Sequence, residues 1–409
     1  MILSFTFTNH RSFRDRTVFS MEATASQAKS ENIAMVNSPE GMHRLLKATL
    51  IYGANASGKT NILRALSSLS NEVRGNSLTV GGDNLGPMYT PFCLDDTSCK
   101  KPASMDISFV TKDMRYDYHV QYNREVILEE NLYYYPNGAN KSSLFSRDVD
   151  YGEQMHGPHY PTTRPKGDMR PRFGVFKNKL LLSKFFIDTP HDIITPAAQY
   201  IANIGFANNY SSNMKSILWR ESKNLLYEAD YKRKLTRLLQ YADLGIHDFK
   251  LPVNEQYEKV FLMHNVNQEG VFPKISIAEE SLGTQYLFLL GPKILFSLEK
   301  GTPLFVDEIE SGLHPRLTDF VIKMYQSEQI NPLNSQIIIV THDVSLMNED
   351  RLRRDQIWFA EKGVDGVSDL FSLSDFEGVR EDTPFAKWYL ANKFGALPDI
   401  KQVESLFDA

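Results

Sequence analysis

The chain has 409 residues, of which 42% are hydrophobic and 23% charged, and its formal net charge is −5. This composition predicts a folded protein with two or more domain-sized units. The negative charge argues against a protein that coats nucleic acid. The sequence has neither an apolar stretch of membrane-spanning length nor a signal peptide, so we expect a cytoplasmic protein without a membrane partner. Cys93 and Cys99 predict two ordinary reduced thiols.

The first 75 residues predict strands, a loop and one helix. Alternating apolar and polar residues over 1–22 indicate two strands, whereas the polar stretch 24–44 predicts a loop. The apolar run 48–52 predicts a buried strand. The helical spacing of apolar residues after residue 60 predicts a helix that continues to about residue 73.

A phosphate-binding loop lies between that strand and that helix. Residues 53–60 fit the pattern G-x-x-x-x-G-K-[ST], in which backbone N–H groups and the helix N-terminus face phosphates. Lys59 supplies a cation for the β- and γ-phosphates of ATP, and Thr60 supplies a hydroxyl for Mg²⁺. The residues predicted to contact the nucleotide here are Gly53, Asn55, Ala56, Ser57, Gly58, Lys59, Thr60 and Asn61.

The middle of the chain changes character twice. Residues 86–150 alternate with period two and predict successive antiparallel strands, and 180–245 predict helices without a coiled-coil repeat. We therefore expect three regions: an N-terminal part with the phosphate-binding loop at 1–95, a β-rich and then helical insertion at 96–250, and a C-terminal α/β part at 251–409. A basic cluster could meet phosphates, although a solvated loop is the favoured interpretation; it comprises Arg164, Lys166, Arg170, Arg172, Lys177 and Lys179.

From residue 258 the pattern returns to alternating strands and helices. The buried strand 303–306 ends in Asp307 and Glu308, at the strand end where parallel sheets bind ligands. Asp307 is predicted to hold Mg²⁺, and Glu308 to orient or deprotonate the attacking water. The buried strand 336–340 is followed by His342, which could donate a hydrogen bond to the γ-phosphate. The strand at 356–359 is predicted to lie at a sheet edge.

Ser281 precedes an apolar helix predicted over 283–298 and is well placed to cap it. Gly283 permits close approach to backbone, so this helix start is either only a cap or a second phosphate-binding site that serves a nucleotide held by another subunit.

In this order the motifs resemble those of ATP-binding-cassette (ABC) type ATPase heads. They are most similar to bacterial stand-alone ATPases of the OLD-like, abortive-infection and PARIS type. The resemblance makes 53–60 a Walker A motif with a typical Asn55, 304–308 a Walker B motif, 311–315 a D-loop and His342 a switch histidine. Residues 281–285 resemble a degenerate cassette signature. The segment 7–13 resembles one that touches adenine and phosphates, which implies contacts from Asn9, Arg11 and Ser12.

The resemblance implies an α/β head with a mixed sheet, an antiparallel β subdomain and a helical insertion. It also implies a homodimer or higher homo-oligomer in which two heads sandwich ATP and Mg²⁺, with Ser281 reaching the partner's nucleotide. Two departures are the absence of a Q-loop glutamine near 88–92 and the Leu282–Gly283 pair where transport cassettes have two glycines.

Three functions remain open at this point. The first is an anti-phage ATPase switch. Its effector, such as a Toprim-type nuclease, is expected to be a separate protein, because only residues 399–409 follow Pro398. The second is a DNA-repair or chromosome-maintenance ATPase that binds nucleic acid through the basic cluster. The third and weakest is a transporter subunit.

Overall fold

The computed structural model describes residues 1–75, 85, 88–148, 177–207, 214–242, 245–252, 256–265 and 272–399. The chain forms two compact units. Unit 1 comprises Met1–Asn203 with Met347–Ala409, and unit 2 comprises Ile204–Leu346. The boundaries expected at 95/96 and 250/251 stay a prediction. Most of the basic cluster, from Arg164 to Arg172, lies outside the described residues.

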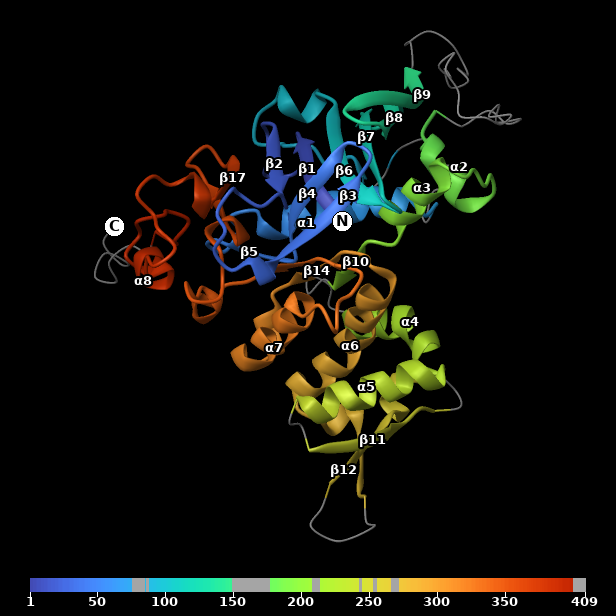
Figure 1. Cartoon of the computed structure of the whole chain (residues 1–409), viewed down its shortest axis with the longest axis vertical. Helices are drawn as coiled ribbons and strands as arrows, with labels where there is room; N and C mark the ends of the chain where they lie inside the picture. Colours follow the sequence, from blue (N-terminus) through green and yellow to red (C-terminus); the bar gives the residue numbers. More distant parts are fainter. Residues whose placement is uncertain are drawn as a thin grey trace. The chain divides into compact units, whose positions relative to one another are not determined.

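An antiparallel sheet dominates unit 1 (Figure 1). In its strands at 103–111 and 114–122, buried side chains largely alternate with half-buried ones, which confirms the strands predicted there from the period-two pattern. The order is β2-β1-β6-β7-β8-β9. The bounds are β1 Ile2–Thr8, β2 Thr17–Ser20, β6 Ala103–Thr111, β7 Met114–Tyr122, β8 Ile127–Asn137 and β9 Asn140–Asp148.

The loop predicted over 24–44 is wrong, because a hairpin forms there. Its strands are β3 Ile33–Ser38 and β4 Gly41–Leu46, which pair antiparallel. Only the ends of the hairpin are buried, at Ile33 and Ala34 on one strand and Leu45 and Leu46 on the other. The other residues of the hairpin are exposed or half-buried. The polar sequence of this stretch therefore gave no indication of strands.

The predicted nucleotide loop lies between β5 Ala48–Tyr52 and α1 Lys59–Val73, at the predicted strand and helix. β5 pairs in parallel with β16 Ile357–Lys362, and β16 pairs antiparallel with β17 Ser368–Ser372, so this sheet is mixed. The expected edge position of 356–359 is therefore wrong, because β16 has a neighbour on each side.

The described residues of unit 1 also form the helices α2 Leu181–Ile187, α3 Ile194–Ala202 and α8 Phe385–Leu390. The buried Glu130 carboxylate of β8 accepts hydrogen bonds from the N–H groups of Leu181 and Leu182, at 2.7 and 2.9 Å. Because these N–H groups open α2, Glu130 caps that helix and fixes it to the antiparallel sheet.

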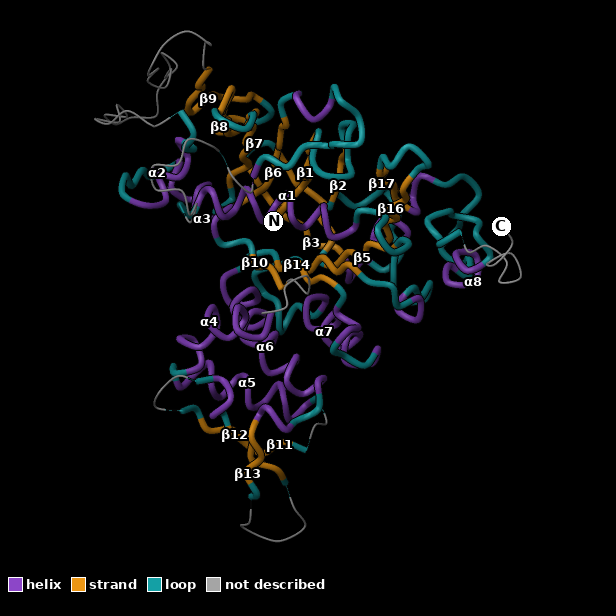
Figure 2. The backbone as a smooth tube through the Cα atoms, turned by 180° about the vertical axis from the view of Figure 1, so that it is seen from behind, coloured by secondary structure: helices purple, strands orange, loops and turns teal. Residues whose placement is uncertain are grey.

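Parallel pairing joins three strands in the described part of unit 2, namely β10 Gly205–Ala207, β14 Leu304–Asp307 and β15 Ile337–Val340. Its helices are α4 Met214–Leu226, α5 Ala229–Tyr241, α6 Leu282–Lys300 and α7 Pro315–Gln326 (Figure 2). The first three confirm helices that the sequence predicted. A small antiparallel sheet follows the order β11-β12-β13, with bounds Ile246–Lys250, Phe261–His264 and Lys274–Ser276.

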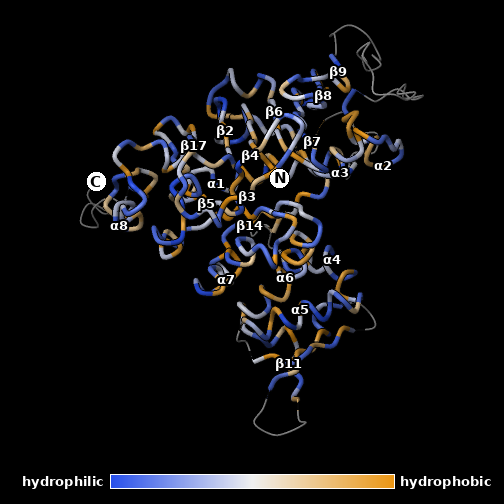
Figure 3. The backbone as a smooth tube through the Cα atoms, viewed as in Figure 1, coloured by the Kyte–Doolittle hydropathy of each residue, from blue (hydrophilic) through white to orange (hydrophobic). Residues whose placement is uncertain are grey.

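The helix α6 is apolar along most of its length (Figure 3), and its side chains are buried on nearly every side. It is a core helix of unit 2, packed by α4 and α5. Among the described residues, no helix is both apolar enough and long enough to pass through a lipid bilayer.

Candidate nucleotide site

The loop between β5 and α1 has a backbone that side chains would obstruct. Gly53 and Gly58 adopt φ values of +150° and +110°, which L-residues rarely adopt. A Cβ at Gly53 would lie 2.2 Å from the Ala360 carbonyl oxygen, and one at Gly58 would lie 2.7 Å from Ser368 Oγ and 2.8 Å from Ser12 Oγ. Both glycines are therefore required by conformation and by space.

The polar groups of the loop fit a phosphate ligand. Lys59 is 5% exposed and donates from Nζ to the carbonyl oxygens of Gly53 and Ala54, each at 2.8 Å. Ser57 Oγ is buried without a hydrogen-bond partner among the described residues. ATP phosphates need hydrogen-bond donors. The Ser57 hydroxyl, the Lys59 ammonium group and the N-terminus of the 15-residue helix α1 can provide them.

The N-terminal segment reaches this loop through Ser12. Asn61 Nδ2 donates to Ser12 Oγ at 2.8 Å, and the Ser12 carbonyl oxygen accepts the N–H of Ser368 at 2.7 Å. The Arg11 N–H donates to the Thr90 carbonyl oxygen at 2.7 Å. Ser12 is thus placed beside Gly58, and the contacts of Arg11 and Ser12 with the nucleotide stay a prediction.

Asn9 is held by hydrogen bonds to the segment 92–102. Its Nδ2 donates to the carbonyl oxygens of Ser98, Lys101 and Pro102, at 2.9, 2.9 and 3.2 Å, and its Oδ1 accepts the N–H of Phe92 at 3.0 Å. The side chain is 3% exposed. These bonds use both ends of the amide, and the contact of Asn9 with the nucleotide stays a prediction.

In unit 2 the acidic pair lies at the carboxyl end of β14. Asp307 is 2% exposed and pairs in register with Val340 of β15. Glu308 adopts φ +48°, a left-handed conformation that turns the chain away from the strand, and its N–H donates to the Val340 carbonyl oxygen at 2.9 Å. The ends of β14 and β15 therefore bring Asp307, Glu308 and Thr341 together.

Glu310 is a site residue that the sequence reasoning missed. Its Oε2 accepts a hydrogen bond from Thr341 Oγ1 at 2.8 Å, and its Oε1 accepts the backbone N–H of His342. The exposed His342 is consequently held by its backbone next to the acidic pair. A third acid two residues after Glu308 was the only available signal.

The predicted helix start at Ser281 is confirmed as an N-cap. Ser281 Oγ accepts the Thr284 N–H at 3.1 Å and lies 2.8 Å from Thr284 Oγ1. Ser281 is exposed, as is Leu282 at 67%. A Cβ at Gly283 would lie 2.9 Å from the Gly312 carbonyl oxygen, so this position has no room for a side chain, and its contact with a phosphate stays a prediction.

A family model described as "AAA domain, putative AbiEii toxin, Type IV TA system" matches residues 48–348. The match covers well over half of the chain, and it begins at β5 and includes every motif described above from the phosphate loop to His342. The chain belongs to this AAA-domain family.

Two solved structures are similar at 14% sequence identity. The SMC head domain from Thermotoga maritima gives a TM-score of 0.43, with 91% of this chain and 98% of that chain covered. The SmcHead bound to the C-winged helix domain of ScpA gives 0.44, with 91% and 97% covered. No curated protein matched the sequence.

The AAA-domain chain thus presents two groups of predicted site residues. In unit 1, Ser12 and Asn61 meet the loop that carries Lys59. In unit 2, the pairing of β14 with β15 places Asp307 and Glu308 near the end of β15. Glu310 accepts hydrogen bonds from Thr341 and from the backbone of His342, which holds His342 at the same strand end. Thr60 and Asp307, the residues predicted to share Mg²⁺, belong to different units, and their joint use stays a prediction.

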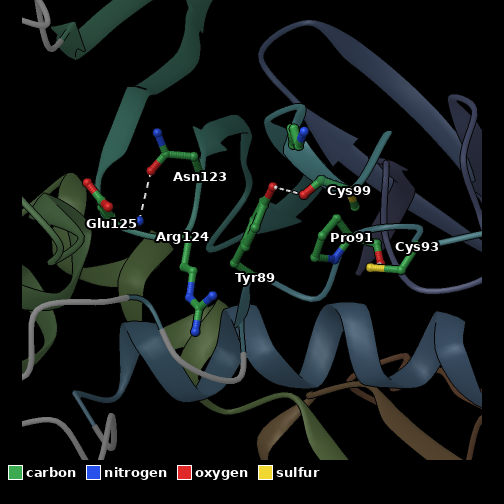
Figure 4. A pocket seen from close by; sticks show the side chains of 8 residues that line it. Tyr89, Pro91, Cys93, Cys99, Asn123, Arg124 and Glu125 are labelled. Carbon is green, nitrogen blue, oxygen red and sulfur yellow. Dashed lines mark hydrogen bonds between the residues drawn. The ribbon is translucent and has the colours of Figure 1, made fainter. Parts of the chain in front are cut away.

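A separate cavity of about 610 Å³ lies in unit 1 of the AAA-domain protein (Figure 4). Tyr89 stands between Arg124 and Pro91 in the close-up, and its hydroxyl donates to the carbonyl oxygens of Cys99 and Lys101, at 3.1 and 2.8 Å. Both cysteines that line the cavity, Cys93 and Cys99, are free thiols. None of the described residues that line this cavity is a predicted nucleotide contact.

Proposed function

We propose that this AAA-domain protein is an ATP-hydrolysing switch of the ABC-type head class. One observation carries the proposal: the phosphate loop combines two glycines that cannot accept a Cβ, a buried Ser57 hydroxyl that has no hydrogen-bond partner in the described part of the chain, and a lysine that donates to loop carbonyls. Membership of the AAA-domain family supports it.

Each residue then has a defined task. When ATP binds, Lys59 leaves the carbonyl oxygens of Gly53 and Ala54 and binds the β- and γ-phosphates. Backbone N–H groups of the loop donate to the oxygens of the same phosphates. Thr60 and Asp307 would hold Mg²⁺, which neutralises phosphate charge when bound. Glu308 orients the attacking water and takes up its proton. His342, with its backbone fixed by Glu310, donates to the γ-phosphate.

The second half of each site comes from another copy of the chain in this proposal. The support is the exposure of Ser281 and of the large apolar Leu282 at the start of α6. A helix N-terminus suits phosphate, and an exposed leucine beside it suits a protein contact. ATP would thus join two copies, and hydrolysis would release them.

The decisive experiment compares the wild type with Lys59→Ala and Glu308→Gln. We expect Lys59→Ala to abolish ATP binding, and Glu308→Gln to bind ATP, hydrolyse it slowly and double its light-scattering mass with Mg²⁺-ATP. Lys323→Ala, which alters an exposed lysine of α7, is the matched control and should behave as wild type. Hydrolysis that survives in Lys59→Ala would refute the ATPase assignment, and an unchanged mass would refute the sandwich.

The biological role we propose is anti-phage defence by abortive infection, acting through a separate effector such as a Toprim-type nuclease. It is supported by the family description, which names a putative toxin of a type IV toxin–antitoxin system. Capture of partners by Glu308→Gln with ATP, analysed by mass spectrometry against Lys59→Ala, tests it. A nuclease retained only by the ATP-trapped protein supports the role, and recovery of no partner in either sample counts against it.

A further inference from the structure

The first turns of α6 pack tightly against the turn that follows β14. A Cβ at Gly312 would lie only 2.5 Å from Cδ1 and Cγ of the Tyr286 ring. Gly312 has an ordinary φ of −128°, so what requires a glycine here is space and not conformation. Together with the contact between Gly283 and the Gly312 carbonyl oxygen, this fixes the helix that starts at Ser281 to the D-loop of the same chain.

The Tyr286 hydroxyl is the unusual part of this contact. The residue is 4% exposed, and its hydroxyl has no hydrogen-bond partner among the described residues. Burial raises the pKa of Tyr286, and the charges of Asp307, Glu310 and Glu308 raise it further. The phenol is therefore protonated and has an unused donor within electrostatic reach of all three acids.

An unpaired buried hydroxyl destabilises a folded protein. Phenylalanine would fill the same space against Gly312 without that cost, so packing accounts for the ring and leaves the hydroxyl unexplained. The three acids near it are the groups that the proposed function assigns to metal binding, water activation and support of His342.

We propose that Tyr286 is a positioning residue, whose hydroxyl donates to the Asp307–Glu308 pair when the nucleotide site is filled and whose ring makes the start of α6 move with the Gly312 turn. The inference rests on the proposed ATPase function and deepens it. Phosphate that binds at Ser281 thereby affects Asp307 and Glu308 of the same chain. These acids direct hydrolysis at that chain's own nucleotide site.

The test is Tyr286→Phe, with Tyr257→Phe as the matched control. Tyr257 is also a buried tyrosine of unit 2 whose hydroxyl has no partner among the described residues, and its pKa is raised by burial and then by Glu258 alone. Both variants should fold with an unchanged or higher Tm. We expect kcat to fall about tenfold in Tyr286→Phe with KM nearly unchanged, and neither value to change in Tyr257→Phe.

A readout independent of turnover is hydrogen exchange of the backbone with Mg²⁺-ATP. In the wild type, peptides covering 281–286 and 304–313 should be protected together. Gly312→Ala, which forces the ring away, should separate the two responses, and Tyr286→Phe should reduce the protection of 304–313 only.

Wild-type kcat and protection in Tyr286→Phe would overturn the inference even if Lys59→Ala is inactive as expected. Hydrolysis that persists in Lys59→Ala would instead overturn the proposed function itself. Because Tyr286→Phe preserves the packing against Gly312, this test does not depend on Gly312→Ala folding.

Discussion

Glu310 holds Thr341 beside the end of β14, because its Oε2 accepts a hydrogen bond from the threonine hydroxyl at 2.8 Å. The other carboxylate oxygen accepts the backbone N–H of His342. One side chain therefore determines where the chain leaves β15, and with it the position of the proposed γ-phosphate donor.

Replacing Glu310 by alanine should leave ATP binding intact and slow hydrolysis. Hydrogen bonds to a charged group contribute about 1.5–3 kcal/mol, so we expect kcat to fall roughly 10- to 100-fold. Steady-state ATPase assays alongside a fluorescent-nucleotide titration measure the two effects. Glu328→Ala, at an exposed acid of the same unit, is the control. A full wild-type rate in Glu310→Ala would show that His342 needs no such support.

Gly58→Ala should remove ATP binding. The new Cβ meets Ser368 Oγ and Ser12 Oγ below 3 Å and adopts an unfavourable φ of +110°. Gly138→Ala is a control outside the loop, because the φ of Gly138 is +60° and no atom of the described residues lies within 4 Å of an added Cβ. Isothermal titration with ATP should give no binding for Gly58→Ala and wild-type binding for Gly138→Ala. Equal affinity of the two variants would contradict the role of crowding.

Arg353→Ala should strongly destabilise unit 1. Its fully buried guanidinium forms a bidentate pair with Asp355, with N–O distances of 2.7 and 2.9 Å, and also donates to the carbonyl oxygens of Ser26 and Ala28. Removing one partner of a buried pair costs about 3–5 kcal/mol in the free energy of unfolding. Urea denaturation measures the loss.

Arg14 provides the contrasting case, since its pair with Asp15 is exposed to solvent. Arg14→Ala should leave the urea midpoint unchanged within error. If both arginine variants shifted the midpoint equally, burial would not be what makes the Arg353 pair important.

His10 should make the protein less stable as the pH falls. Burial, followed by the charges of Arg11 and Arg64, lowers the pKa of His10 to about 3, so the folded protein keeps this ring neutral while the unfolded chain binds a proton near its ordinary pKa of 6.5. The unfolded state therefore gains protons first, and stability is lost from about pH 6.5 downward, towards pH 3. His10→Gln should remove this part of the slope in urea denaturation between pH 6.5 and 4.5. An identical slope in both proteins would contradict the neutral ring.

Strong local patterns made much of the fold predictable. The strand 48–52 and helix α1 coincide with their predictions because an apolar run, a glycine-rich loop and a helical repeat are consecutive. The acids at the end of β14 were likewise marked by their place at the end of an apolar strand. The hairpin of β3 and β4 was missed because solvent covers most of it, so its sequence shows little alternation.

Contacts between distant residues were beyond the reach of the sequence. Glu310 and Thr341 are 31 positions apart, and their hydrogen bond depends on the pairing of β14 with β15. Asn9 lies in a segment that resembles one of a known family, but the resemblance did not indicate its hydrogen-bond partners. These partners lie at 92–102, in a stretch without regular periodicity. The edge position expected for β16 was wrong because a sequence pattern does not show how many neighbours a strand has.

The bonds of Asn9 have a consequence for protein engineering. Because this amide joins the end of β1 to the segment 92–102, while Ser12 three residues later touches Asn61 and Gly58, the antiparallel sheet and the phosphate loop cannot be exchanged as independent modules. A chimaera that takes 88–148 from a relative would need that relative's residues 1–13 as well. Junctions placed between the two would leave the grafted sheet without its anchor and the loop without its support.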